Sequence, residues 1–318
     1  MSHDILIKVE TLSRVYGSRR AVDDIGFELR RGEVLGFLGP NGAGKSTTMR
    51  MITGNLAPSG GRITINGIDL LDRPREAKAQ LGFLPEQPPL YREFTVDEYL
   101  DYCARLRRIA RPRRHAARDS AKQRCGLGQV GERLIGNLSK GYQQRVGIAQ
   151  AIIHNPAVVV LDEPTVGLDP NQIREIRALI RELGDEHGVI LSTHILPEVQ
   201  ATCDRVQIIN NGRLVLSDDL DALARHSRSS SLILRLGQRP DAGMLEAVPG
   251  VEAVQELDHG RWRIHHAPDE SPAAALAERA VQQGWVLLEL TPEQRSLEEV
   301  FVDITAGDDM APGTPEAA

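Results

Sequence analysis

Residues Gly39 to Ser46 read Gly-Pro-Asn-Gly-Ala-Gly-Lys-Ser and directly follow the apolar run 34–38. This is the spacing G-x-x-x-x-G-K-[ST], in which each part has a different phosphate-binding task. The glycines let the backbone curl so that several N–H groups point at one anion. Lys45 adds a positive charge that reaches the β- and γ-phosphates, and the Ser46 hydroxyl is a ligand for Mg²⁺. The pattern predicts a triphosphate site, and a bare glycine turn between strand and helix explains less of it.

The phosphate-binding loop requires a strand before it and a helix after it. The apolar run supplies the strand, and the helix is expected to begin near Lys45, with its N-terminus facing the same anion. We therefore expect nucleotide contacts from the whole segment, which comprises Gly39, Pro40, Asn41, Gly42, Ala43, Gly44, Lys45, Ser46 and Thr47.

Two carboxylates follow a second apolar run, 158–161. A strand buried on both faces delivers Asp162 at its carboxyl end, beside the phosphate-binding loop, where it can hold Mg²⁺ through water. Glu163 is then placed to orient or deprotonate an attacking water. In isolation a strand that ends in a solvated acidic turn explains these residues equally well. The phosphate-binding loop in the same chain favours the catalytic interpretation.

The rest of the first 220 residues alternates strand and helix patterns, which predicts an α/β fold. Capping-box spacing at Thr95 and Glu98 opens a helical stretch that continues to about residue 124. The predicted strands are 5–9, 25–29, 62–66, 157–161, 189–192 and 206–209, followed by a hairpin turn at 210–212. The predicted helices are 139–154, 171–186 and one after His194.

The last hundred residues predict a second, smaller domain. Polar residues at 223–230 are interpreted as a linker. Domain 231–306 begins with the order βαββαβ, which is the ferredoxin-like α+β arrangement. Its predicted strands are 231–236, 252–257, 261–266 and 285–291, and its helices are 240–248, 272–283 and 296–305. The remaining residues, 307–318, predict a disordered tail.

Bulk composition excludes several classes of protein. A chain of 318 residues is long enough for two cores, and its net charge of −6 gives no general reason to bind nucleic acid. The three cysteines are isolated from one another, which argues against a disulfide framework or a zinc site and for a reducing cytosol. The N-terminus lacks the apolar stretch of a signal peptide, and no run approaches the ~20 apolar residues that span a bilayer. Any action at a membrane would require a partner.

A third motif narrows the interpretation to a family. Residues 138–145 read Leu-Ser-Lys-Gly-Tyr-Gln-Gln-Arg and by themselves predict a serine-capped polar helix. In company with Glu163 and the phosphate-binding loop, they resemble the L-S-G-G-Q signature of ATP-binding cassette (ABC) ATPases. The resemblance runs in family order from residue 5 to about residue 220. It implies an ATP-binding domain at 1–222, with a P-loop core, an antiparallel β subdomain and a helical subdomain at about 88–155.

The resemblance also implies roles for single residues. Tyr16 would stack on adenine, Gln87 would mark the junction to the helical subdomain, and His194 would sense the γ-phosphate. Taken alone, each is explained better by packing, by a loop or by a satisfied polar group, and only its place in the family order favours the functional role. The implied cofactors are ATP and Mg²⁺. The implied catalytic residues are Lys45, Gln87, Glu163 and His194; the Mg²⁺ ligands are Ser46, Gln87 and Asp162; and further nucleotide contacts are Tyr16, Ser139, Gly141 and Asp169.

The signature departs from the family pattern at two positions. Lys140 stands where the first glycine is usual, and Tyr142 stands where glutamine is usual. Ser139 and Gly141, which would donate hydrogen bonds to phosphate, are intact, so we expect activity. Lys140 either adds charge near the nucleotide or points to solvent, and we expect the latter. A regulatory module with slow turnover is the corresponding alternative.

The partners are implied by the same resemblance. Two nucleotide-binding subunits would pack head to tail as a homodimer, and the helical subdomain would meet an integral membrane permease. Residues 84–91 and 292–301 resemble ATPase subunits of ABC-2 type exporters, which implies a cytoplasmic protein held at the inner face of the cell membrane. No nucleic-acid partner is expected. The alternative is a soluble ABC ATPase that acts on ribosomes or DNA.

One dense basic run, 105–115, remains. A solvated helix end is the simplest interpretation. Contact with anionic lipid or an acidic partner loop is the second, and nucleic-acid binding is the weakest because no aromatic residues are interleaved.

Overall fold

A six-stranded sheet forms the centre of the first part of the chain. It comprises β3 (Val34–Leu38), β6 (Leu81–Leu84), β7 (Val158–Asp162), β8 (Gly188–Thr193), β9 (Arg205–Asn210) and β10 (Arg213–Asp219). Their order is β10-β9-β3-β8-β7-β6, and all pairs are parallel except β9 with β10. Every residue of β3, β7 and β8 is buried, which is why 34–38 and 158–161 read as unbroken apolar runs.

This computed structural model describes residues 5–219, 228–267 and 270–294. The chain divides into two units, Met1–Leu220 and Asp221–Ala318. The predicted helix 296–305 and tail 307–318 lie outside the described residues. Within the described ranges, no helix has the length and apolar character needed to span a membrane.

An antiparallel sheet with the order β2-β1-β4-β5 forms a second layer of the first unit. Its strands are β1 (Ile5–Tyr16), β2 (Arg19–Arg30), β4 (Gly60–Ile65) and β5 (Ile68–Asp69), so the first two are longer than the predicted segments 5–9 and 25–29. The helix α1 (Lys45–Ile52) shares one apolar core with both sheets, through residues that include Phe27, Phe37 and Met49. The core holds the start of α1 against the ends of the parallel strands.

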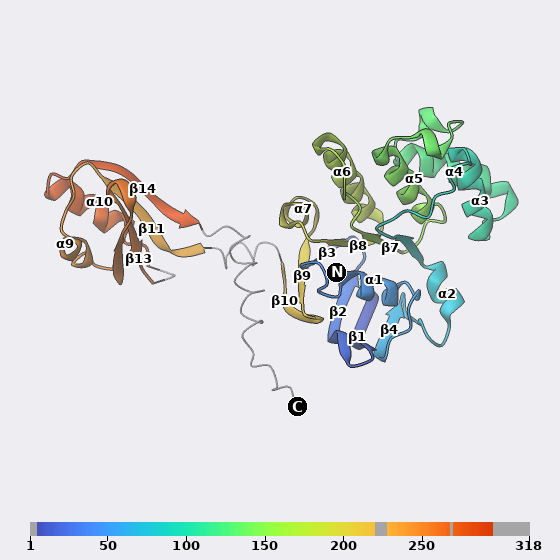
Figure 1. Ribbon diagram of the computed structural model, residues 1–318, viewed down its shortest axis with the longest axis horizontal. Coiled ribbons are helices and arrows are strands. Elements are labelled where there is room, and N and C mark those ends of the chain that lie inside the picture. The colour runs from blue at the N-terminus through green and yellow to red at the C-terminus, as the bar shows by residue number, and fades with distance from the viewer. Residues whose placement is uncertain (1–4, 220–227, 268–269, 295–318) are drawn as a thin grey trace. The chain divides into compact units, whose positions relative to one another are not determined.

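The helical subdomain consists of α3 (Val96–Leu106), α4 (Arg111–Arg124) and α5 (Lys140–Ile152), which lie together on one side in Figure 1, away from β1, β2 and β4. The predicted capping box at Thr95 is confirmed, and the helical stretch predicted to about residue 124 consists of two helices, α3 and α4. The chain turns between α3 and α4 because Arg108 has φ +58°, and Pro112 restarts the helix in its first turn.

The remaining helical segments connect the sheets. They are α2 (Pro74–Ala79), α6 (Pro170–Glu186), α7 (Leu196–Thr202) and the short 3₁₀ turns Gly128–Val130 and Ile135–Asn137. The predicted hairpin turn is confirmed between β9 and β10. Asn211 and Gly212 have φ of 46° and 81°, as the tight primed turn of a hairpin requires.

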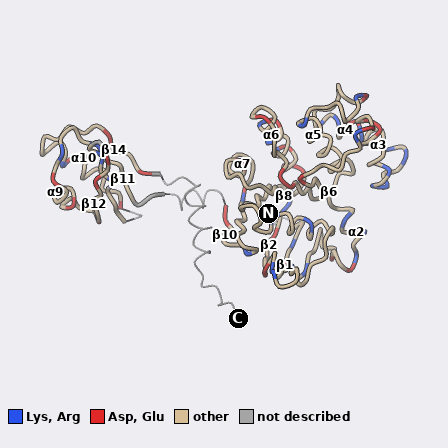
Figure 2. The backbone as a smooth tube through the Cα atoms, viewed as in Figure 1, with Lys and Arg blue, Asp and Glu red and all other residues tan. Residues whose placement is uncertain are grey.

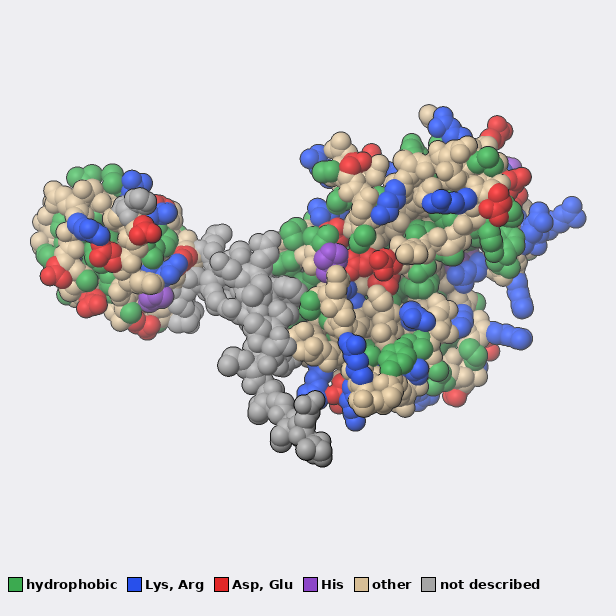
Figure 3. Space-filling model, viewed as in Figure 1, with side chains coloured by type: hydrophobic (Ala, Val, Ile, Leu, Met, Phe, Trp, Pro, Cys, Tyr) green, Lys and Arg blue, Asp and Glu red, His purple; other side chains and the backbone are tan. Residues whose placement is uncertain are grey.

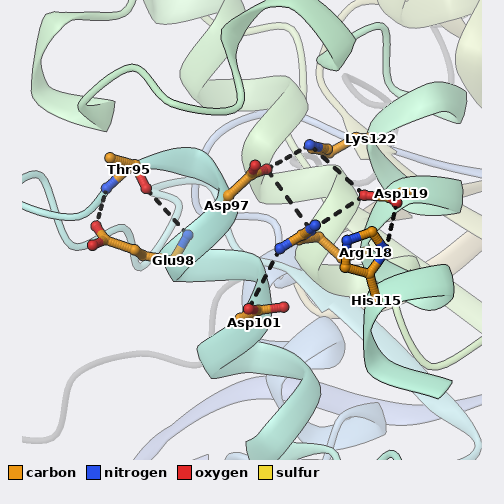
Figure 4. A network of polar contacts seen from close by, with 8 residues as sticks. All are labelled: Thr95, Asp97, Glu98, Asp101, His115, Arg118, Asp119 and Lys122. Atoms are coloured by element: carbon orange, nitrogen blue, oxygen red, sulfur yellow. Dashed lines mark hydrogen bonds and ion pairs between the residues drawn. The ribbon is translucent and has the colours of Figure 1, made fainter. Parts of the chain in front are cut away.

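An ion-pair network joins α3 to α4 (Figure 4). Lys122 Nζ lies 2.6 Å from Asp97 Oδ1, and Arg118 reaches both Asp101, at 3.5 Å, and Asp119, at 3.2 Å. Partly exposed pairs of this kind stabilise by about 0.2–1 kcal/mol each. Their geometry, from both helices at once, fixes how α3 lies on α4.

The basic run 105–115 spans the turn between α3 and α4. Figure 2 shows Lys and Arg positions along the backbone beside α3, and Figure 3 shows Lys and Arg side chains projecting from that edge of the first unit. Arg107 and Arg114 are half-buried and donate hydrogen bonds to the carbonyls of Lys78 and Ile109. The exposed members are Arg105, Arg108, Arg111, Arg113 and His115. The prediction of a solvated helix end is therefore right for these exposed members only.

His154 makes the stability of the first unit dependent on pH. Its Nε2 donates to the Leu81 carbonyl at 3.0 Å, while its Nδ1 has no hydrogen-bond partner in the described structure. Burial, and then the nearby Arg107 charge, lower the pKa of His154 from 6.5 to about 4. The folded protein therefore disfavours the proton that the unfolded chain accepts. This stability is complete above pH 6.5 and is lost as the pH falls toward 4.

We expect the free energy of unfolding to fall by about 2–3 kcal/mol between pH 6.5 and pH 4 on account of His154. Urea titrations of the wild type and of His154→Asn, across this range, would measure the difference in slope. Equal slopes in the two proteins would contradict the prediction.

The second unit contains β11 (Arg228–Leu236), α9 (Ala242–Glu246), β12 (Ala253–Glu256), β13 (Arg261–His265), α10 (Ala273–Gln282) and β14 (Leu287–Gln294), with a 3₁₀ turn at Asp258–Gly260. The four strands form an antiparallel sheet in the order β12-β13-β11-β14, which is the ferredoxin-like arrangement predicted. Leu232, Trp262 and Leu276 lie in its core.

The predicted linker 223–230 requires a correction. β11 begins at Arg228, which pairs with Gln294 of β14, so residues 228–230 belong to the sheet. Pairing with a neighbouring strand outweighs the weak strand preference of Ser-rich sequence. Residues 223–227 lie outside the described residues.

Candidate functional site

The phosphate-binding loop joins β3 to α1 and depends on glycine at two close approaches. A Cβ on Gly39 would lie 2.3 Å from the carbonyl oxygen of Ile209. Gly44 has φ +112°, and a Cβ there would lie 2.7 Å from the carbonyl oxygen of Ala21. Any larger side chain would push the loop away from its neighbours and change where its N–H groups point.

Lys45 is held inside this loop. Its side chain is 5 % exposed, and Nζ donates to the carbonyls of Gly39 and Pro40 at 2.9 Å and 3.2 Å. Nζ also lies 3.5 Å from Glu163 Oε1. A buried ammonium group needs such partners. They fix its charge at the base of the loop, where the α1 N-terminus adds its own positive dipole end.

Glu163 is held in an unusual backbone conformation. It has φ +50°, which costs energy for any residue other than glycine, and its N–H donates to the Ser192 carbonyl at 2.9 Å. The carboxylate is buried, and Oε2 lies 2.9 Å from Nδ1 of His194. Glu163 therefore stands between an ammonium and an imidazole, with its position set by β7 and β8.

Asp162 ends β7, in register with Ser192 of β8. It is 4 % exposed, and its Oδ1 has no hydrogen-bond partner within the described part of the chain. A buried carboxylate oxygen without a donor fits a cation or an ordered water. Together with the hydroxyl of Ser46, which lines the cleft described below, it supplies oxygen atoms of the kind that Mg²⁺ takes.

A cleft of about 670 Å³ brings most of the predicted nucleotide contacts together. It is lined by the predicted residues Tyr16, Asn41, Gly42, Gly44, Lys45, Ser46, Thr47, Glu163 and His194. Tyr16 is 45 % exposed, and the Arg14 guanidinium lies 4.6 Å from its ring centroid. Cation–π contact of this kind holds the ring in place as one wall of the cleft.

Sequence reasoning missed four lining residues, Arg19, Ala21, Glu86 and Val166. Three of them lie within three residues of a predicted one: Arg19 is three residues after Tyr16, Glu86 directly precedes Gln87, and Val166 is three residues after Glu163. Ala21 has no predicted residue so near. For the other three, the available signal was therefore proximity in sequence, with Arg19 as the one added positive charge.

The other predicted residues do not line the cleft. Gly39, Pro40, Ala43 and Asp162 belong to the loop and strand behind it, and Gln87 is exposed on the segment after β6. Ser139, Gly141 and Asp169 lie at the starts of α5 and α6, so the structure does not bring them to the phosphate-binding loop of the same chain.

The signature segment contacts the loop that precedes α6. Ser139 Oγ accepts a hydrogen bond from the Tyr142 N–H at 3.4 Å, and Asp169 caps α6. Lys140 is exposed, in agreement with the expectation that it points to solvent. Its Nζ nevertheless lies against Gly167, only 2.1 Å from where a Cβ on that glycine would be.

Comparisons with known proteins agree with this geometry. The sequence profile of the ABC transporter family matches residues 22–166. The chain is 33 % identical to the bacitracin transport ATP-binding protein BcrA of Bacillus licheniformis, over 95 % of this chain and 98 % of that protein. It is 32 % identical to the daunorubicin resistance ATP-binding protein DrrA3 of Streptomyces coeruleorubidus, over 96 % and 97 %. A solved ATP-binding subunit of an ABC transporter matches with a TM-score of 0.63 and 34 % identity, over 70 % of this chain and 92 % of that chain.

Proposed function

This chain belongs to the ABC transporter family as an ATP-binding protein, and we propose that two copies pair head to tail around ATP and drive a separate membrane permease. Its activity is the hydrolysis of ATP coupled to transport. The observation that carries the site assignment is the contact of Glu163 with both Lys45 and His194 in one cleft.

Each of these residues has a chemical task in the proposed reaction. The loop N–H groups and Lys45 stabilise the negative charge that develops on the γ-phosphate. Glu163 accepts the proton of the attacking water, and the contact with the same ammonium fixes the position of its carboxylate. His194 holds that carboxylate and reaches the γ-phosphate side of the cleft. Tyr16 offers a ring face to adenine.

Mg²⁺ fits the residues that remain. Asp162 and Ser46 would hold it, with Gln87 as a further ligand, and the ion would supply charge to neutralise the β- and γ-phosphate oxygens. The residues described in the structure contain no group of three His, Cys, Asp or Glu that could bind a metal by protein ligands alone.

The proposed pairing of two copies is supported by the absence of Ser139 and Gly141 from the residues that line the cleft. Its wall consists of the phosphate-binding loop and the ends of β7 and β8, while Ser139 and Gly141 lie elsewhere in the chain. Ser139 caps the N-terminus of α5, an end that carries unpaired N–H groups suited to an anion. A second copy would bring its Ser139 and Gly141 to the open side of the triphosphate and exclude water.

A complementation experiment tests this arrangement. We expect Lys45→Ala and Ser139→Glu each to be inactive, since one breaks the loop and the other places a carboxylate against the partner's γ-phosphate. Mixed in equal amounts, they should recover about one quarter of the wild-type rate. Random pairing makes half of the dimers mixed, and each of these holds one intact site.

The contrary outcome is equally clear. If the loop and the signature served a single site within one chain, mixing the two variants would restore no hydrolysis. A mixture of Lys45→Ala with Lys45→Ala/Ser139→Glu, in which no dimer has an intact site, serves as the control.

We further propose an ABC-2 type exporter, with the protein bound through its permease at the inner face of the membrane. The names of BcrA and DrrA3 refer to bacitracin transport and daunorubicin resistance, which supports export as the direction. The relatives found offer no support for the alternative of a ribosome- or DNA-acting ATPase. Co-purification of the chain with a membrane protein expressed beside it would test the proposal.

A further inference from the structure

Glu198 is a buried carboxylate to which the reaction above assigns no task. It lies on α7 and is 1 % exposed. One carboxylate oxygen accepts a hydrogen bond from Thr165 Oγ1, and the other accepts one from Thr193 Oγ1 at 2.7 Å. All three side chains are buried. The carboxylate therefore bridges two hydroxyl groups in the interior of the unit.

The two threonines belong to the loops that carry Glu163 and His194. Thr165 is two residues after Glu163, beyond the end of β7, and Thr193 is the last residue of β8, directly before His194. Thr193 Oγ1 also accepts a hydrogen bond from the Ile195 N–H at 3.1 Å. Through these hydrogen bonds, Glu198 connects the segment that follows Glu163 to the residue that precedes His194.

Burial of this carboxylate needs a reason. A carboxylate removed from water is costly unless it is hydrogen-bonded, and an apolar side chain would fill the same place without that cost. Its two oxygens instead have directed bonds to Thr165 and Thr193, which lie just beyond the last residues paired between β7 and β8, Asp162 and Ser192. Glu163, with φ +50°, stays in its strained conformation only because its surroundings hold it there.

We propose that Glu198 is a positioning residue for ATP hydrolysis, which sets the distance between Glu163 and His194 by bridging Thr165 and Thr193. The inference rests on the proposed role of Glu163. Glu198 does not line the cleft, so it acts on the rate of the chemical step and not on ATP binding. The hydroxyl groups of Thr165 and Thr193 are the two links through which it acts.

Near-isosteric variants test the proposal without opening a cavity. Thr165→Val removes the bond to Glu198, and Thr193→Val removes the bonds to Glu198 and to the Ile195 N–H. Both keep the shape of the side chain, and Thr165→Ser and Thr193→Ser keep the hydroxyl. We expect kcat to fall about 10-fold in each valine variant, with the KM for ATP unchanged and with kcat recovered in the serine variants. Thermal unfolding of each variant reports on folding separately.

A double-mutant cycle gives the second readout. If Glu198 acts through these two links, the valine substitutions will have no further effect on kcat in a Glu198→Ala background. Equal kcat in wild type and both valine variants would overturn the proposal, and so would a loss that the serine variants share or one that appears in KM alone.

The Glu163→Gln variant separates the positioning role of Glu198 from the catalytic role of Glu163. If Glu163→Gln is inactive while the valine variants keep wild-type kcat, Glu198 has no positioning role and the function stands. If Glu163→Gln is fully active, the assignment of Glu163 fails, and the positioning role of Glu198 fails with it.

Discussion

Replacement of Glu163 by glutamine is expected to reduce ATP hydrolysis by about 10²–10⁴-fold while ATP binding is retained. The amide has nearly the same shape as the carboxylate, so the contacts with Lys45 and His194 in the cleft lose charge without losing position. It cannot accept the proton of the attacking water. Steady-state phosphate release and binding of a fluorescent ATP analogue would measure the two effects separately.

The same variant should accumulate the ATP-bound pair, because nothing would then remove the γ-phosphate that holds the two copies together. Size-exclusion chromatography with and without ATP would measure this shift. Glu76→Gln is the matched control, since Glu76 is an exposed carboxylate on α2 that pairs with Arg73. Full hydrolysis by Glu163→Gln would remove Glu163 from the mechanism.

Lys45→Ala is expected to lower both ATP affinity and the rate of hydrolysis, the latter by about 10²–10³-fold. The variant removes an ammonium group that contacts a loop carbonyl and Glu163, on a lysine that is only 5 % exposed. It leaves the buried carboxylate of Glu163 facing phosphate without an intervening positive charge. The loss should therefore appear in KM as well as in kcat, unlike the loss in Glu163→Gln.

Lys78→Ala provides the comparison for this second variant. Lys78 is also a partly buried lysine whose Nζ donates to a backbone carbonyl, that of Gly54, at 2.7 Å. It does not line the cleft. We expect Lys78→Ala to hydrolyse ATP at the wild-type rate. If the wild type hydrolysed ATP no faster than Lys45→Ala, the result would instead favour a regulatory module with slow turnover.

Much of the first unit was predictable because strands buried on both faces and a glycine loop leave strong local patterns. The runs at 34–38 and 158–161 cannot avoid burial, so their ends had to meet at one edge of the sheet, and Lys45 and Glu163 indeed lie 3.5 Å apart. The order of strands in the second unit also followed from the alternation of strand and helix patterns.

The errors arose where local pattern carries no signal. The helical pattern at 95–124 did not place the break between α3 and α4, which depends on a positive φ at Arg108 and is followed by Pro112 in the first turn of α4. The start of β11 at Arg228 depends on a partner strand that lies more than sixty residues later in the chain. Arg19 lines the cleft only because β1 and β2 pair beside α1.

The sequence by itself determined the chemistry of this protein, because the glycine loop, the Asp162-Glu163 pair and the signature segment each need particular residue types at short, fixed spacing. Only the tertiary structure decided which of them share a cleft. It places Lys45, Glu163 and His194 together and leaves Ser139 and Gly141 on another element. Tertiary structure alone also brings Glu198 between two loops that are 28 residues apart in sequence, from Thr165 to Thr193. Distances between segments are set by packing and hydrogen bonding of the whole chain, which short-range spacing does not encode.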